Sequence, residues 1–146
     1  MQDNSEKFEN FIVPDFPKNE SSVYMIYCVK DDKEIPIYVG ETDKLRRRIG
    51  DYIVASFQAP TDFKVGEAVR YFQEKGCKIT IRYKGVQKEH RRGEEDRIID
   101  GLRKAGYRLL NDLGTYNYKT ADEEKERARI IREFCDNILK NDRYQS

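Results

Sequence analysis

Two neighbouring stretches rich in β-branched and aromatic residues constrain the fold of this chain more than any other feature. Residues 22–29 read SVYMIYCV and residues 35–40 read IPIYVG, with the short polar stretch KDDKE between them. Such residues favour strands, and two such runs joined by a short polar connection predict a β-hairpin. Pro36 cannot donate a ladder hydrogen bond, so it should lie in an edge strand or at the start of its strand.

Helical periodicity begins directly after the hairpin. Apolar residues recur at helical spacing in four segments, near residues 42–53, 66–75, 93–105 and 120–139. Gly76 and Gly106 should end the second and third of these helices, because glycine readily adopts the left-handed conformation at a helix C-terminus. Residues 77–86 alternate apolar and polar residues, as a half-exposed strand does. We also expect a short helix at residues 6–11.

The order β-β-α-α-β-α-α predicts an α+β fold with a small three-stranded antiparallel sheet flanked by helices. We expect residues 1–20 to be a lead-in, residues 21–118 to form the main domain, and residues 119–146 to form an amphipathic C-terminal helix. The apolar stripe of that helix can pack on the same domain or on a second subunit. A homo-oligomer formed through it is therefore one of two alternatives.

Composition excludes several classes of protein. A chain of 146 residues suits one domain, and 38% hydrophobic residues are too many for a disordered tail. No apolar run approaches the roughly 18 residues of a membrane span, and the polar N-terminus does not resemble a signal peptide. Three cysteines without a CxxC pair favour a reducing, intracellular (cytoplasmic) location. The net charge of +1 means that any attraction to nucleic acid must be local.

The length of the hairpin turn decides whether Tyr24 and Tyr38 lie on the same face of the sheet. In a regular hairpin the sequence numbers of two residues that pair always add up to the same value. Tyr24 and Tyr38 share a face only if that value is even. A three-residue loop at residues 31–33 pairs residue 26 with 38 and residue 24 with 40, which puts both phenols on one face. A two-residue loop puts them on opposite faces.

Four motifs along the chain resemble, in order, those of the GIY-YIG nuclease family. They read SVYMIY, IYVGETDKLRRR, GEEDRII and LLN, and together they extend over about residues 21–112. The best match is YVGETDKLRRR, with its Tyr-Val-Gly tripeptide, a threonine two residues later, and then Leu-x-x-Arg. The chain departs from the family in having Ser22 where the first tripeptide has glycine, and in a slightly longer spacer between the tripeptides. The fold that this resemblance implies agrees with the one predicted above.

The resemblance also implies a set of catalytic residues: Tyr24, Tyr38, Arg48, Tyr52, Glu95 and Asn111. It makes Tyr24 the general base, Arg48 the phosphate clamp, and Glu95 the ligand of a divalent cation, Mg²⁺ or Mn²⁺. Glu94 competes with Glu95 for the last role, but only Glu95 has apolar residues three and four positions later. Each residue also has a plainer explanation, since tyrosines are common in strands, and a glutamate in the first turn of a helix is favoured by the helix dipole.

Two local basic clusters, KLRRR and KEHRR, flank the expected site. The residues that we expect to contact nucleic acid are Lys44, Arg46, Arg47, Lys88, Arg91 and Arg92. Charge runs of this kind are often only solvated surface. His90 is expected to be a loop residue, because no second histidine or paired cysteine completes a zinc site.

From these residues we expect a metal-dependent endonuclease that acts on DNA. The competing hypothesis is the same fold without catalysis, binding nucleic acid or a protein partner. A third is a small α+β interaction protein whose resemblance to nucleases is accidental.

Overall fold

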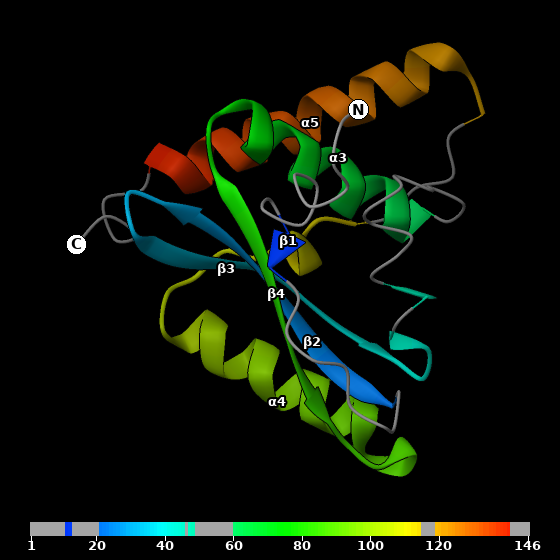
Figure 1. Ribbon diagram of the computed structural model, residues 1–146. Coiled ribbons are helices and arrows are strands. Elements are labelled where there is room, and N and C mark those ends of the chain that lie inside the picture. The colour runs from blue at the N-terminus through cyan, green and yellow to red at the C-terminus, as the bar shows by residue number, and fades with distance from the viewer. Residues whose placement is uncertain (1–10, 13–20, 46, 49–59, 115–118, 141–146) are drawn as a thin grey trace, which may run out of the picture.

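The computed structural model describes residues 11–12, 21–45, 47–48, 60–114 and 119–140, and its centre is a small sheet (Figure 1). Strand β2 (Ser22–Lys30) lies between β3 (Lys33–Thr42) and β4 (Lys78–Gly85), and it is antiparallel to both. This confirms the predicted three-stranded antiparallel sheet and the α+β class. Strand β3 is at the edge of the sheet, as Pro36 requires.

A fourth, two-residue strand lies beyond the predicted sheet. Strand β1 (Phe11–Ile12) pairs in parallel with Ile79 and Thr80 on the outer edge of β4. Phe11 is therefore in a strand, and the helix predicted for residues 6–11 is wrong at that position. Residues 6–10 lie outside the described part of the chain.

The hairpin combines a short turn with a bulge. Lys30 pairs with Lys33, so the turn has only two residues, Asp31 and Asp32, with φ of +52° and +65°. Positive φ at both central residues is typical of the type I′ turn that joins two twisted strands. The register then shifts by one residue between Ile26 and Tyr27, so that Ile26 pairs with Tyr38 and Tyr24 with Gly40.

This geometry corrects one step of the sequence argument. A two-residue turn was expected to put Tyr24 and Tyr38 on opposite faces, but the extra residue in β3 restores the even sum further along the hairpin. The pairs that a three-residue loop would give, 26 with 38 and 24 with 40, are present, although the turn has two residues.

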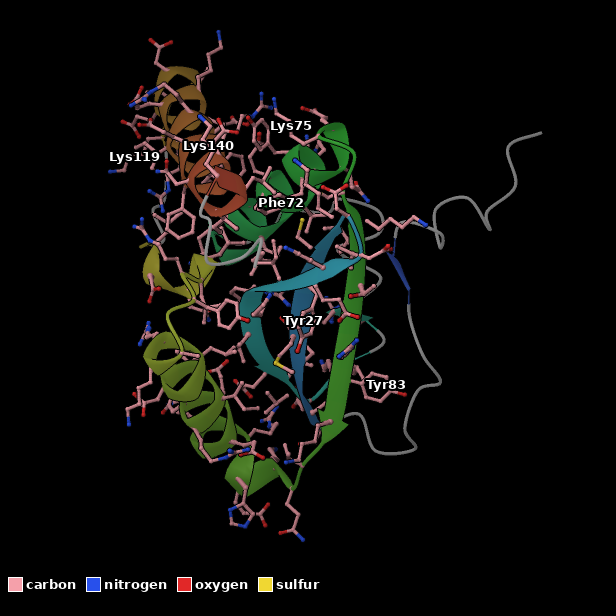
Figure 2. All side chains as sticks on the ribbon, turned by 90° about the vertical axis from the view of Figure 1, so that its left-hand side faces the viewer. Tyr27, Phe72, Lys75, Tyr83, Lys119 and Lys140 are labelled. Atoms are coloured by element: carbon pink, nitrogen blue, oxygen red, sulfur yellow. The ribbon has the colours of Figure 1, made fainter. Side chains whose placement is uncertain are left out.

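Helices cover both faces of the sheet (Figure 1). Helices α3 (Pro60–Glu74) and α5 (Ala121–Lys140) share one buried cluster with Tyr24, Ile26 and Cys28 of β2. Phe72 of α3 lies in that layer, while Lys119 and Lys140 lie at its outer surface (Figure 2). Helix α4 (Arg91–Lys104) covers the opposite face.

The predicted helix ends agree with the structure better than the predicted helix starts do. Gly76 and Gly106 have φ of +85° and +98°, just beyond the ends of α3 and α4, as predicted. Helix α3 begins at Pro60, six residues before the predicted start, and α4 begins two residues before its predicted start. Two short 3₁₀ helices, η1 (Lys88–His90) and η2 (Leu110–Asp112), flank α4.

The C-terminal helix packs on its own chain. Its predicted stripe is buried or half-buried, and Ile131, Phe134, Cys135 and Ile138 belong to the core cluster shared with α3. The Thr120 hydroxyl accepts a hydrogen bond from the backbone N–H of Glu123 (3.1 Å) and so caps the N-terminus of this helix. None of the helices that the structure describes is long and apolar enough to cross a membrane.

Candidate active site

Two buried tyrosines form the centre of the candidate site. Tyr24 of β2 and Tyr38 of β3 are 2% and 7% exposed, and their ring centroids are 6.2 Å apart with the planes inclined by 48°. Both side chains lie on the face of the sheet covered by α3 and α5. Of the two arrangements that the sequence left open, the structure therefore has the one in which the phenols share a face.

Gly40 provides the space for the Tyr24 ring. A Cβ atom built on Gly40 would lie 2.4 Å from both Cζ and the phenol oxygen of Tyr24, and 2.8 Å from Cε1. No side chain fits in that space, so the ring lies directly against the backbone of β3. Sequence reasoning used this glycine only as part of a motif and gave it no role. The pairing of residue 40 with residue 24 in the hairpin was the signal that could have assigned Gly40 a role in seating the Tyr24 ring.

Arg48 approaches the same phenol from the segment that follows β3. Residues 45, 47 and 48 are helical, and the N–H of Arg48 donates to the carbonyl of Lys44 (2.9 Å). Leu45 is fully buried and anchors this turn to the core. The Nε of Arg48 then donates to the Tyr24 phenol oxygen at 3.4 Å. Tyr24, Tyr38 and Arg48 thus come together as expected.

Two expected residues of this segment, Arg46 and Tyr52, lie outside the residues whose side chains the structure describes. Their assignments stay predictions. Lys44 and Arg47 are exposed next to the Arg48 turn.

Glu95 is a half-buried carboxylate on α4. Burial raises its pKa to about 6, with the negative charges of Glu41 and Asp96 adding to the effect and Arg92 opposing it. No hydrogen bond or ion pair of Glu95 is formed within the described residues. An available carboxylate of this kind suits a hard divalent cation, which takes oxygen ligands and often keeps several waters.

Glu94, the competing carboxylate, is already paired. It forms salt bridges with Arg97 and Lys84, each at 2.5 Å. These two partners lower the pKa of Glu94 to about 2. Glu94 therefore links α4 to β4, and Glu95 is the one of the two without such a partner.

Glu95 lies beside the end of β3 and not on the tyrosine face itself. Helix α4 packs on the opposite face of the sheet from Tyr24, and the charge that acts on Glu95 from β3 is that of Glu41. Glu41 directly follows Gly40, on which the Tyr24 ring rests. The end of β3 is thus the part of the molecule where the two sides of the candidate site approach each other.

Asn111 contacts the backbone of β3. Its Nδ2 donates to the carbonyl of Val39 (2.7 Å), and its Oδ1 accepts from the N–H of the same residue (3.0 Å). The amide thus takes the place of a neighbouring strand along the edge of β3, between Tyr38 and Gly40. This contact fixes the loop after α4 to the strand that carries the site.

The second basic cluster lines a hollow of about 530 Å³ at the start of α4. Its lining residues are Glu41, Lys88, Glu89, Arg91 and Arg92. Lys88 and Arg92 are exposed, whereas the Arg91 side chain is only 16% exposed and pairs with Glu41 at 3.2 Å. His90 lies in η1 on the surface. The described residues contain no group of three or more His, Cys, Asp or Glu side chains that could hold a metal.

Comparison with known families identifies the domain. The family model described as the GIY-YIG catalytic domain matches residues 20–108, which include the hairpin, α3, β4 and α4. No significant match was found among curated proteins or among solved structures.

Proposed function

Because the chain belongs to the GIY-YIG catalytic domain family, we propose that it is a metal-dependent endonuclease that hydrolyses DNA phosphodiester bonds. Membership of the family indicates nuclease activity in general. The observation that supports the specific proposal is the meeting of Tyr24, Tyr38 and Arg48 over Gly40, which leaves no room for any other residue at that position.

Hydrolysis of a phosphodiester needs an activated water and neutralisation of the charge on the phosphoryl oxygens. In this proposal Tyr24, as the deprotonated phenolate, accepts the proton of the attacking water and returns to the phenol. A free phenol has a pKa of about 10, so it serves as a base at neutral pH only with positive charge close by. The Arg48 guanidinium at 3.4 Å supplies that charge, and in this proposal it also binds the phosphate.

Tyr38 and Tyr52 orient the water or the phosphate in this proposal. Asn111 acts through the backbone of Val39, so its role is to position Tyr38 and Gly40. Glu95 would hold Mg²⁺ or Mn²⁺, with water and phosphate oxygens completing its ligands. When bound, the cation supplies electrostatic stabilisation of the leaving oxygen.

The basic residues around the site supply the DNA contacts in this proposal. Four basic side chains are exposed on either side of the end of β3, where they can meet phosphates of one strand: Lys44, Arg47, Lys88 and Arg92.

Intracellular location and a homo-oligomer stay predictions. The stripe of the C-terminal helix is covered within its own chain, so light scattering is the direct measurement of oligomeric state.

Cleavage of supercoiled plasmid in Mg²⁺ or Mn²⁺ tests the proposal. Tyr24→Phe and Glu95→Gln should each reduce cleavage by at least about 100-fold, the contribution typical of a general base or a metal ligand. Tyr27→Phe and Glu94→Gln are matched controls, because Tyr27 lies on the opposite face of the sheet and Glu94 forms only structural ion pairs. Both controls should cleave like the wild-type protein.

Two results would contradict the proposal. Cleavage that survives both site substitutions would mean a contaminating nuclease or a wrong site. DNA binding by the wild-type protein without cleavage in either metal would support the inactive binding module instead.

A further inference from the structure

The proposed site has two parts that belong to opposite faces of the sheet. Tyr24 and Arg48 lie on the face covered by α3 and α5, whereas Glu95 is on α4, which covers the other face. The two parts can act on one phosphate only if the first turn of α4 keeps a fixed position relative to the end of β3. A polar contact between these two segments is therefore functionally important.

Arg91, the first residue of α4, makes such a contact. Its Nη1 lies 3.2 Å from Oε2 of Glu41 and 4.0 Å from Oδ1 of Asp43, so one guanidinium reaches two carboxylates at the end of β3. The side chain is 16% exposed, and its buried Nε has no hydrogen-bond partner among the residues that the structure describes. This burial separates Arg91 from its exposed neighbours Lys88 and Arg92.

We propose that Arg91 is a positioning residue that fixes Glu95 relative to the Tyr24 phenol, and that it is not a phosphate contact. The inference rests on the proposed function. Arg91 and Glu95 are four residues apart, so they lie on the same side of α4. Arg91 holds that side against Glu41, which directly follows Gly40.

The remaining contacts of α4 join its first turn to a different strand or hold its later turns. Glu94 ties the helix to Lys84 of β4, and Ile98, Ile99 and Leu102 pack its later turns on the sheet. Loss of the Arg91 contact should therefore release the first turn from the end of β3 and leave the later turns of the helix in place.

The first test compares Arg91→Gln with Lys88→Gln, which removes an exposed charge of the same basic cluster. Single-turnover cleavage at saturating DNA should fall about 10- to 100-fold in Arg91→Gln, as expected when a reacting group is misplaced by about 1 Å. Its DNA affinity, measured without divalent metal, should stay within about twofold, with an unchanged salt dependence. Lys88→Gln should weaken binding and reduce the salt slope by about one unit.

Two further measurements keep the inference falsifiable if Arg91→Gln is unstable. The exchanged pair Glu41→Arg with Arg91→Glu should recover part of the cleavage rate that each single substitution loses. Amide hydrogen exchange at residues 95–98, which donate to carbonyls of the first turn, should become faster in Arg91→Gln, while residues 100–104 keep their rates.

Specific outcomes would overturn the inference. A loss of affinity and salt slope in Arg91→Gln with an unchanged saturated rate would make Arg91 a phosphate contact. Unchanged exchange at residues 95–98 would show that Arg91 does not hold the first turn. A wild-type protein that leaves DNA intact would contradict the proposed function itself, and the exchange experiment would then still decide whether Arg91 holds α4.

Discussion

Substitution of Gly40 by alanine should displace the Tyr24 phenol without removing any functional group. The added Cβ would lie 2.4 Å from both Cζ and the phenol oxygen, and ordinary contact begins near 3.4 Å. The ring or the strand must therefore move by about 1 Å. Tyr24 is 2% exposed and packed in the core, so it has no free space in which to move.

Two effects of different size should follow. Overpacking of a buried site typically costs about 1–3 kcal/mol of stability, which for a domain of this size lowers Tm by about 3–10 °C. A 1 Å displacement of a reacting group can cost about 100-fold in rate. The Arg48 Nε, now 3.4 Å from the phenol oxygen, would also lose its alignment. The variant should therefore remain folded at 25 °C and cleave about 100-fold more slowly.

The control is Gly85→Ala, the same chemical change at the end of β4, where an added Cβ meets nothing within 4 Å. It should keep the wild-type rate and Tm. A double-mutant cycle adds specificity. In a Tyr24→Phe background, Gly40→Ala should lower the rate by less than about threefold, because the phenol that it displaces is already absent.

Equal rates for Gly40→Ala and Gly85→Ala, measured with both proteins folded, would refute this reasoning. So would full additivity of Gly40→Ala with Tyr24→Phe, since the alanine would then act on some other part of the site.

Two further predictions concern side chains around the site. Asn111→Ala should lower the free energy of unfolding by about 1–3 kcal/mol in thermal denaturation, because it leaves both backbone groups of Val39 unpaired. Asn111→Asp keeps the acceptor and should recover only part of that loss; full recovery would show that the donor bond adds nothing. The pKa of Glu94 is held near 2 by Arg97 and Lys84, so its contribution to stability is present above about pH 4.3 and is lost as the pH falls toward 2. The Tm of Glu94→Gln should therefore fall less than the Tm of the wild-type protein between those pH values. Parallel curves of Tm against pH for the two proteins would contradict this.

The elements that could be predicted are those with a local signal. Strands β2, β3 and β4 have dense β-branched and aromatic residues, and Gly76 and Gly106 have no competing explanation near their helix ends. Strand β1 has no such signal. Its two residues are ordered by pairing with β4, nearly 70 positions later, and that information is not in the local sequence.

The same distinction applies to the candidate site. Tyr24, Tyr38 and Arg48 could be named from motifs, and their proximity is confirmed. The difference between Glu94 and Glu95 depends in part on Lys84, which belongs to another element, so only the spacing of apolar residues favoured Glu95 beforehand. The contact between Asn111 and Val39 joins residues 72 positions apart, and no spacing rule predicts it.

The hairpin shows why turn length alone is a poor guide to which side chains share a face. Asp31 and Asp32 suit a two-residue type I′ turn, because aspartate tolerates positive φ better than most residues. That turn by itself would separate the two phenols. The register shift opposite Tyr27 inserts one residue into β3, next to Pro36, which cannot donate a ladder hydrogen bond in any case. A bulge is therefore least costly at that point. One extra residue there moves each later side chain of β3 to the face opposite the one it would have in a regular hairpin with the same turn. Removal of Ile37 should consequently abolish the bulge and leave Ile26 opposite Tyr38 and Tyr24 opposite Gly40, so both phenols should stay on one face and cleavage should persist. A structure of that variant with Tyr38 turned to the other face of the sheet would contradict this account of the register.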